Sequence, residues 1–170
     1  QGNVGDGDES SKTEEVATNL KLLLPLLDGK LENVFLAGYS DIDRESFNGG
    51  LPGFSSKGNR KTLHYQGTLN INESNRLAFG AEQEESKANG DSITTKGLFS
   101  LYELRALDSL IISAGVRRDD HDRFDAVTTG RLAMAFNPYN QITLRASWGE
   151  GFKSPTLFQT TYFCCGATTP

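Results

Sequence analysis

The connections between the patterned segments of this chain alternate between short and long along its whole length. The short ones are four turns rich in Asn, Asp, Ser and Gly, at residues 28–30, 72–75, 106–109 and 137–140. The long ones run through residues 44–60, 86–94 and 119–126, and from residue 152 onward. Eight segments of roughly ten residues lie between them, which is the strand length of a transmembrane β-barrel. Tight turns on the periplasmic side and long loops outside are typical of such barrels.

Most of these segments alternate between apolar and polar residues, as strands with one apolar face do. Ile142, Leu144 and Trp148, for example, alternate with Thr143, Arg145 and Ser147. Eight charged residues fall on the polar side: Arg76, Glu82, Glu84, Glu103, Arg105, Arg117, Arg131 and Arg145. Because an Arg or Lys facing lipid at mid-bilayer costs about 2–4 kcal/mol, this segregation is expected of a lipid-facing surface. The eight residues are therefore predicted to face the lumen.

Composition narrows the classes of protein. Hydrophobic residues make up 36% of the chain, and its longest apolar stretch, Leu22–Leu27, is interrupted by Pro25. A membrane-spanning helix needs about 20 consecutive apolar residues, whereas a barrel strand needs only alternate ones. The net charge of -5 gives no support to a nucleic-acid partner. A soluble antiparallel sheet with one wet face also alternates, and the rhythm of turns and loops favours the barrel over it.

The composition of the two ends of the chain indicates a segment of a longer protein. Residues 1–15 are polar and acidic, which predicts a loop and no secretory signal. The last residues, Thr-Thr-Pro, have a loop composition and no strand pattern. Aromatic residues near strand ends and turns fit interfacial girdles, namely Tyr39, Tyr65, Tyr102, Phe136, Tyr139 and Trp148.

The most specific string is LRASWGEGFKSPTLF at residues 144–158, a strand that runs into Gly-x-Gly-Phe-Lys-x-Pro. It resembles the strand-to-loop signature of TonB-dependent outer-membrane receptors. SAGVRRDDH at residues 113–121 resembles another strand end of that family, and residues 128–133 and the Asn137-Pro138 turn match as well. The resemblance covers residues 110–157, and its nearest branch is that of the cobalamin and siderophore receptors.

The resemblance implies an all-β, antiparallel, up-and-down barrel of about 22 strands with a plugged lumen, in the outer membrane of a Gram-negative bacterium. Residues 1–170 would supply about eight of those strands, without the plug domain. The implied function is TonB-dependent uptake of a scarce nutrient such as cobalamin or an iron-siderophore, without catalysis and without a cofactor. The implied partners are outer-membrane lipid, the plug domain, TonB and the small nutrient ligand.

Two other functions stay open. A complete small barrel with a structural or adhesive role is the first, because eight strands enclose just enough room for side chains. An outer-membrane hydrolase is the second, since Asp119, Asp120 and His121 crowd one predicted loop. No Gly-x-Ser-x-Gly motif accompanies this cluster, and a polar hairpin tip is the favoured interpretation.

Two further groups of residues are weak site candidates. Cys164 and Cys165 are adjacent in the last loop, where an exported context allows a disulfide between them or with other cysteines. A metal site there is disfavoured, because His64 and His121 lie far along the chain. Asp6 and Asp8 are weak calcium candidates, since oxygen-rich loops bind calcium; a solvated run of charge is the favoured interpretation.

Overall fold

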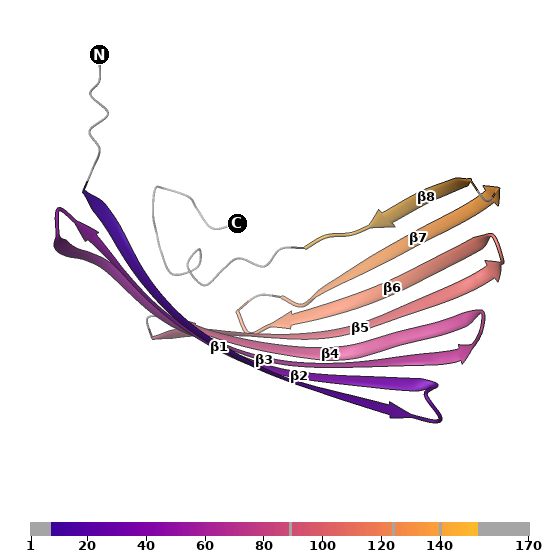
Figure 1. The fold of residues 1–170 in the computed structure, drawn as a ribbon, viewed down its shortest axis with the longest axis horizontal. Helices are drawn as coiled ribbons and strands as arrows, with labels where there is room; N and C mark the ends of the chain where they lie inside the picture. Colours follow the sequence, from indigo (N-terminus) through magenta and orange to yellow (C-terminus); the bar gives the residue numbers. More distant parts are fainter. Residues whose placement is uncertain (1–7, 89, 124, 140, 153–170) are drawn as a thin grey trace, which may run out of the picture.

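The computed structural model describes residues 8–88, 90–123, 125–139 and 141–152, which form a single antiparallel sheet (Figure 1). The strands are β1 Glu9–Leu26, β2 Leu31–Asn48, β3 Leu51–Asn72, β4 Asn75–Ala88, β5 Asp91–Leu107, β6 Leu110–His121, β7 Val127–Tyr139 and β8 Ile142–Gly149. Each strand pairs with its neighbours in the chain, in the order β1 to β8. The predicted all-β, up-and-down architecture is confirmed.

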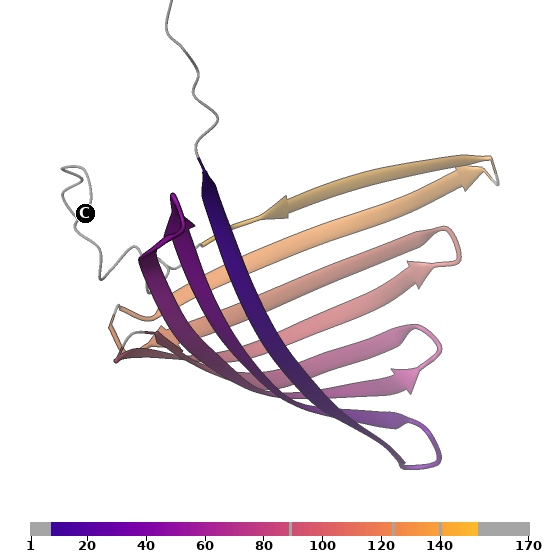
Figure 2. The ribbon, with the colours of Figure 1, turned by 60° about the vertical axis from the view of Figure 1, so that its left-hand side comes forward.

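The sheet is strongly curved and open (Figures 1 and 2). β1 and β8 lie at its two edges, and no pairing joins them among the residues that the structure describes. The alternative of a complete small barrel closed by these eight strands is therefore wrong for this chain. Two unpaired strand edges are a template for further pairing, which fits a segment of a larger sheet.

Of the four predicted long loops, two are wrong, the third is shorter than predicted because residues 122–126 connect β6 and β7, and the fourth lies outside the described residues beyond residue 152. Residues 44–60 belong mostly to β2 and β3, and the two strands are joined by Gly49 and Gly50 alone. Both glycines have positive φ, 58° and 76°, as a tight two-residue hairpin requires. Residues 86–94 likewise lie mostly in β4 and β5, and β6 runs on to His121. In the predicted loop 1–15, β1 already begins at Glu9.

Cross-strand pairing explains this error. Gly, Ser and Pro predict a loop, but each added residue pair of a long hairpin forms ladder hydrogen bonds. The Ser46 hydroxyl also accepts a hydrogen bond from the Phe54 N–H, at 2.9 Å. The short turns were predicted correctly: residues 27–30, 73–74 and 108–109 connect strands. The fourth lies later than predicted, since β7 ends at Tyr139. We call the end of the sheet with these turns the turn end, and the opposite end the loop end.

The strand register divides side chains between two faces. We call the hollow side, which carries Gln66, Arg117 and Arg131, the concave face. The opposite side, which carries Leu63, Leu98 and Leu132, is the convex face. All six predicted girdle aromatics fall on the convex face, as shown by the pairs Tyr39↔Lys61, Phe35↔Tyr65, Leu77↔Tyr102, Phe136↔Leu144, Tyr139↔Ile142 and Leu132↔Trp148.

The sheet has almost no hydrophobic core. Among the described residues, Ile93 is the one buried hydrophobic side chain, at 9% exposure, while Leu63, Leu98 and Trp148 are about 60% exposed. In a soluble sandwich, a second layer would cover such a face. A single layer with an uncovered apolar side instead fits lipid as the covering phase. No helix among the described residues is long and apolar enough to cross a membrane.

Candidate functional site

The concave face carries a row of polar residues that crosses four strands. His64 on β3 lies opposite Glu82 on β4, Glu82 lies opposite Gly97 on β5, and Gly97 lies opposite Asp119 on β6. Direct cross-strand neighbours on one face have Cβ atoms roughly 5 Å apart. The register therefore places an imidazole and two carboxylates in one line across the hollow of the sheet, with a glycine between the carboxylates.

Arg117 joins the two carboxylates across that glycine. Its Nε donates to both carboxylate oxygens of Asp119, at 3.0 and 2.9 Å, and its Nη2 donates to Asp119 Oδ1 at 2.8 Å. The same Nη2 lies 2.6 Å from Glu82 Oε2. A Cβ at Gly97 would lie 2.7 Å from Arg117 Nη2. A larger residue at this position would push the ends of the Arg117 and Asp119 side chains away, so the glycine leaves room for the guanidinium to lie against the strand.

The row continues through Glu82 to the imidazole. Glu82 Oε1 lies 2.9 Å from His64 Nδ1, so one carboxylate binds both the guanidinium and the ring nitrogen. The His64 ring stacks on Phe99, with ring centres 6.0 Å apart. His64, Glu82 and Asp119 are partly shielded from water, which strengthens their electrostatic interactions relative to bulk solvent. We call His64, Glu82, Arg117 and Asp119 the polar row.

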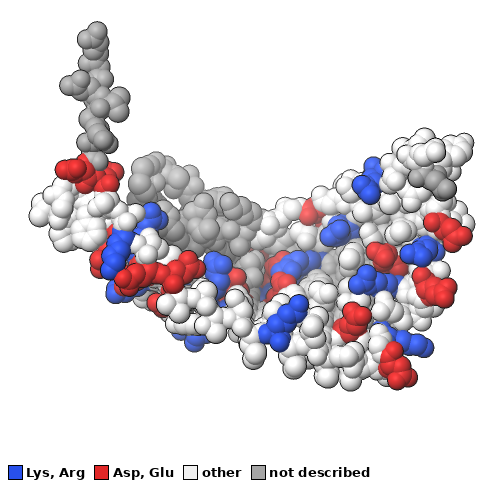
Figure 3. Space-filling view, in the orientation of Figure 1, with Lys and Arg blue, Asp and Glu red and all other residues white. Residues whose placement is uncertain are grey.

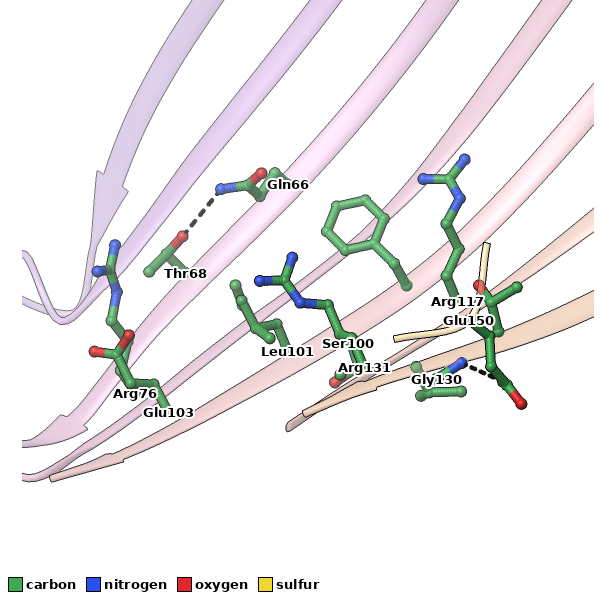
Figure 4. Close-up of a pocket in the computed structure, with 15 residues that line it drawn as sticks. Gln66, Thr68, Arg76, Ser100, Leu101, Glu103, Arg117, Gly130, Arg131 and Glu150 are labelled. Atoms are coloured by element: carbon green, nitrogen blue, oxygen red, sulfur yellow. Dashed lines mark hydrogen bonds between the residues drawn. The ribbon is translucent and has the colours of Figure 1, made fainter. Parts of the chain in front are cut away.

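A pocket of about 460 Å³ adjoins the polar row on its turn-end side (Figure 4). Arg76, Glu103, Arg117, Arg131 and Glu150 contribute charge to its wall, and Phe99 and Leu101 contribute apolar surface. Glu150 is held in place because its Oε2 accepts a hydrogen bond from the Gly130 N–H at 2.9 Å. The pocket combines several polar groups with an apolar wall, as small-molecule sites and packed interfaces both do. Figure 3 shows basic and acidic side chains along the hollow side of the sheet.

The register places all eight predicted lumen-facing residues on the concave face. Of the predicted ladder between arginines and glutamates, the contact between Arg117 and Glu82 is present. Arg131 and Arg145 form no ion pair with these glutamates within the described part of the chain. Glu84 lies 3.5 Å from Arg60 instead, a residue for which the sequence predicts a loop. That this face lines the lumen of a closed barrel stays a prediction.

Sequence reasoning assigned Glu82 and Arg117 to the lumen but missed the other two members of the polar row, His64 and Asp119, and the glycine between the carboxylates. The alternation assigns His64 to the polar side of its strand, but its partner Glu82 lies 18 residues away. Asp119 is predicted to lie in a loop, whereas it belongs to β6. Gly97 carries no signal at all. Alternation and turn positions alone do not bring these residues together, because the register of the strands shifts at irregularities beside the turns.

The acidic cluster near the end of β6 does not form one site. Asp120 and His121 are consecutive in a strand, so their side chains point to opposite faces. Thr95 Oγ1 lies 2.9 Å from His121 Nδ1, and Asp122 accepts a hydrogen bond from the Thr94 N–H. These contacts tie the hairpin of β5 and β6 together, which favours the interpretation as a polar hairpin end.

The remaining candidates are only partly placed by the structure. Asp6, Cys164 and Cys165 lie outside the described residues. Asp8 is exposed, and its backbone carbonyl accepts a hydrogen bond from the Gly49 N–H at 3.1 Å. Within the described ranges, no three His, Cys, Asp or Glu residues are grouped so that they would hold a metal ion. The disulfide and the calcium site stay predictions.

This chain resembles known proteins in its sequence. The family described as "TonB dependent receptor-like, beta-barrel" matches residues 9–169. A curated relative, the vitamin B12 transporter BtuB of Photobacterium profundum, is 23% identical over 165 residues, and the match covers 89% of this chain and 26% of that protein. The chain thus spans about a quarter of the length of this relative.

Two solved structures share the fold. The siderophore receptor PirA from Pseudomonas aeruginosa superposes with a TM-score of 0.77 at 17% identity, over 88% of this chain and 30% of PirA. A mutant of the ferric enterobactin receptor PfeA from the same species gives 0.75 at 15% identity, over 89% and 26%. Because the family match spans nearly the whole chain, the chain belongs to the β-barrel family of TonB-dependent receptors, which are outer-membrane proteins of Gram-negative bacteria.

Proposed function

We propose that this chain forms about eight strands of the barrel wall of a receptor that takes up a scarce nutrient, such as cobalamin or an iron–siderophore complex. TonB transmits the energy of the inner-membrane proton gradient for uptake, and a plug domain fills the lumen. The observation that carries the proposal is the contrast between the two faces: a charged, hydrogen-bonded concave face behind an uncovered apolar convex face.

The open edges support the proposal that the chain works within a larger barrel. β1 is an 18-residue strand whose side chains are exposed along its whole length, and β8 is exposed throughout. Every backbone group in a bilayer must be hydrogen-bonded, so an open edge is not stable at membrane depth. Additional strands that pair with β1 and β8 supply hydrogen-bond partners for the backbone groups at these edges.

The polar row and its pocket have a role in this arrangement. Their carboxylates and guanidinium groups point into the hollow, where we propose that they face the plug domain. A wall with fixed, paired charges recognises a polar partner by electrostatic complementarity rather than by apolar burial. The nutrient class is not specified by these residues; the named relatives transport vitamin B12 or bind siderophores.

Uptake by the full-length receptor tests the proposal. We expect a deletion strain of the source bacterium to lose uptake of one nutrient from a labelled panel of cobalamin and of catecholate and hydroxamate ferric siderophores. The plasmid-borne gene restores that uptake in a strain with TonB and fails to restore it in a strain without TonB. Unchanged uptake of every panel member after deletion, or restoration without TonB, contradicts the proposal.

A further inference from the structure

A groove of about 440 Å³ lies on the convex face, across strands β1 to β4. Two adjacent rows of side chains line it. The row nearer the turn end is apolar on β1, β2 and β3, where Leu20, Ala37 and Leu63 lie opposite one another, and it ends at the polar Gln83 on β4. Leu20 and Leu63 are 70% and 59% exposed, so the small Ala37 between them forms the floor of an apolar slot.

The next row toward the loop end is polar. Tyr39, Lys61 and Glu85 lie opposite one another on β2, β3 and β4. Within β1 to β4, every charged residue on the convex face lies in this row or beyond it toward the loop end, where Asp41 and Lys87 are further examples. The groove therefore crosses the boundary at which the apolar surface of these four strands ends.

The charges around the groove leave Lys61 available for a ligand. Glu85, its cross-strand neighbour, attracts Lys61 through space, but its carboxylate contacts Lys87 Nζ, at 2.7 Å, and not the Lys61 ammonium. Asp41 accepts a hydrogen bond from the Tyr39 hydroxyl at 3.4 Å. Lys61 is exposed and forms no ion pair with any residue that the structure describes.

We infer that this groove binds one phosphorylated lipid of the outer leaflet, the lipid A part of lipopolysaccharide. An acyl chain lies over Ala37 between Leu20 and Leu63, and a glucosamine phosphate accepts hydrogen bonds from the Lys61 ammonium. An apolar slot that opens onto a free cation at the membrane boundary has the polarity of such an amphiphile. The loop end of a barrel faces the outside, which selects the outer leaflet as the source. This inference goes beyond nutrient uptake.

Lipid binding to the full-length receptor tests this inference. The purified receptor is stripped of lipid and placed in phosphatidylcholine nanodiscs that contain diphosphoryl lipid A, and bound lipid is counted by native mass spectrometry. We expect Lys61→Gln to weaken binding about fivefold, the effect of about 1 kcal/mol for one basic residue near an anionic surface. Lys61→Arg retains the wild-type affinity, and Ala37→Leu weakens binding because it fills the slot.

The matched control is Lys21→Gln, which removes a charge from the concave face of the neighbouring strand β1 and leaves binding unchanged. Dephosphorylated lipid A binds the wild-type receptor more weakly than the diphosphoryl form. Three results overturn the inference: equal affinity for Lys61→Gln and wild type, equal affinity for both forms of lipid A, or equal affinity for phosphatidylglycerol and lipid A. The comparisons among lipids use the wild-type protein and so do not depend on the folding of any variant.

Discussion

The two faces of the sheet differ in where they carry charged residues. On the concave face, charges occur at every level, from Arg76 near the turn end to Asp119 near the loop end. On the convex face, strand charges occur only toward the loop end, beyond rows of apolar residues. Arg117 and Arg118 make the contrast within one dipeptide: Arg117 bonds to two carboxylates, and Arg118 makes one long hydrogen bond to Thr128. Whether a face meets lipid or a polar environment therefore decides which residues it tolerates, more than the strand in which those residues lie.

The largest effect is expected from placing one new charge on each face. Ala114 on the convex face lies opposite Tyr102 and Leu132, whereas Ala78 on the concave face lines the charged pocket. We expect Ala114→Arg to lower the free energy of unfolding by about 2–4 kcal/mol, because the guanidinium then faces lipid. Ala78→Arg changes it by about 1 kcal/mol or less. Urea titration of the full-length receptor in lipid vesicles measures both. Equal losses at the two positions contradict the assignment of the faces.

A smaller effect is expected from adding one methyl group to each face. A Cβ at Gly80 on the concave face would lie 2.3 Å from the Tyr65 backbone carbonyl oxygen and 2.5 Å from Phe99 Cζ. A Cβ at Gly67 on the convex face would lie 2.6 Å from Phe79 Cζ. Overpacking costs about 1–3 kcal/mol. We expect Gly80→Ala near the upper value and Gly67→Ala near the lower one, because a lipid-facing ring moves and a backbone carbonyl does not. The same urea titration ranks them, and the reverse order argues against this explanation.

The smallest effect is expected from removing the two neighbouring arginines one at a time. Arg117→Ala leaves the carboxylates of Glu82 and Asp119 without their shared partner, and since all three are partly exposed we expect a loss of about 1 kcal/mol. Arg118→Ala stays within about 0.5 kcal/mol of wild type. If the polar row faces the plug, Arg117→Ala also slows nutrient uptake more than Arg118→Ala does. If the two variants have the same stability and the same nutrient uptake, the polar row contributes to neither.

The sequence predicted those features that depend on near neighbours in the chain. Alternation assigned Arg131 and Arg145 to one side of their strands, and Asp28-Gly29 predicted a turn, because both signals are local. The polar row was out of reach because it depends on register across four strands. That register shifts at irregularities between Asn70 and Asn72 and between Arg105 and Leu107, which no local pattern marks.

Strand length was the other feature that local signals misjudged. Residues 44–60 have the composition of a loop, with four glycines and a proline, yet most of them are strand. The free energy that extends this hairpin comes from backbone pairing between β2 and β3, which composition does not report. The same applies to Glu150, which follows β8 and still pairs with the backbone of Gly130.

The near absence of buried hydrophobic side chains has a consequence for what the stability of this sheet means. With Ile93 as the one buried apolar side chain among the described residues, the sheet gains little from leaving water by itself. The hydrophobic gain arises when lipid covers the convex face, so it depends on how well the apolar rows match the bilayer thickness. The free energy of folding therefore belongs to the protein and its membrane jointly, and a bilayer of different thickness changes it without any change in the sequence.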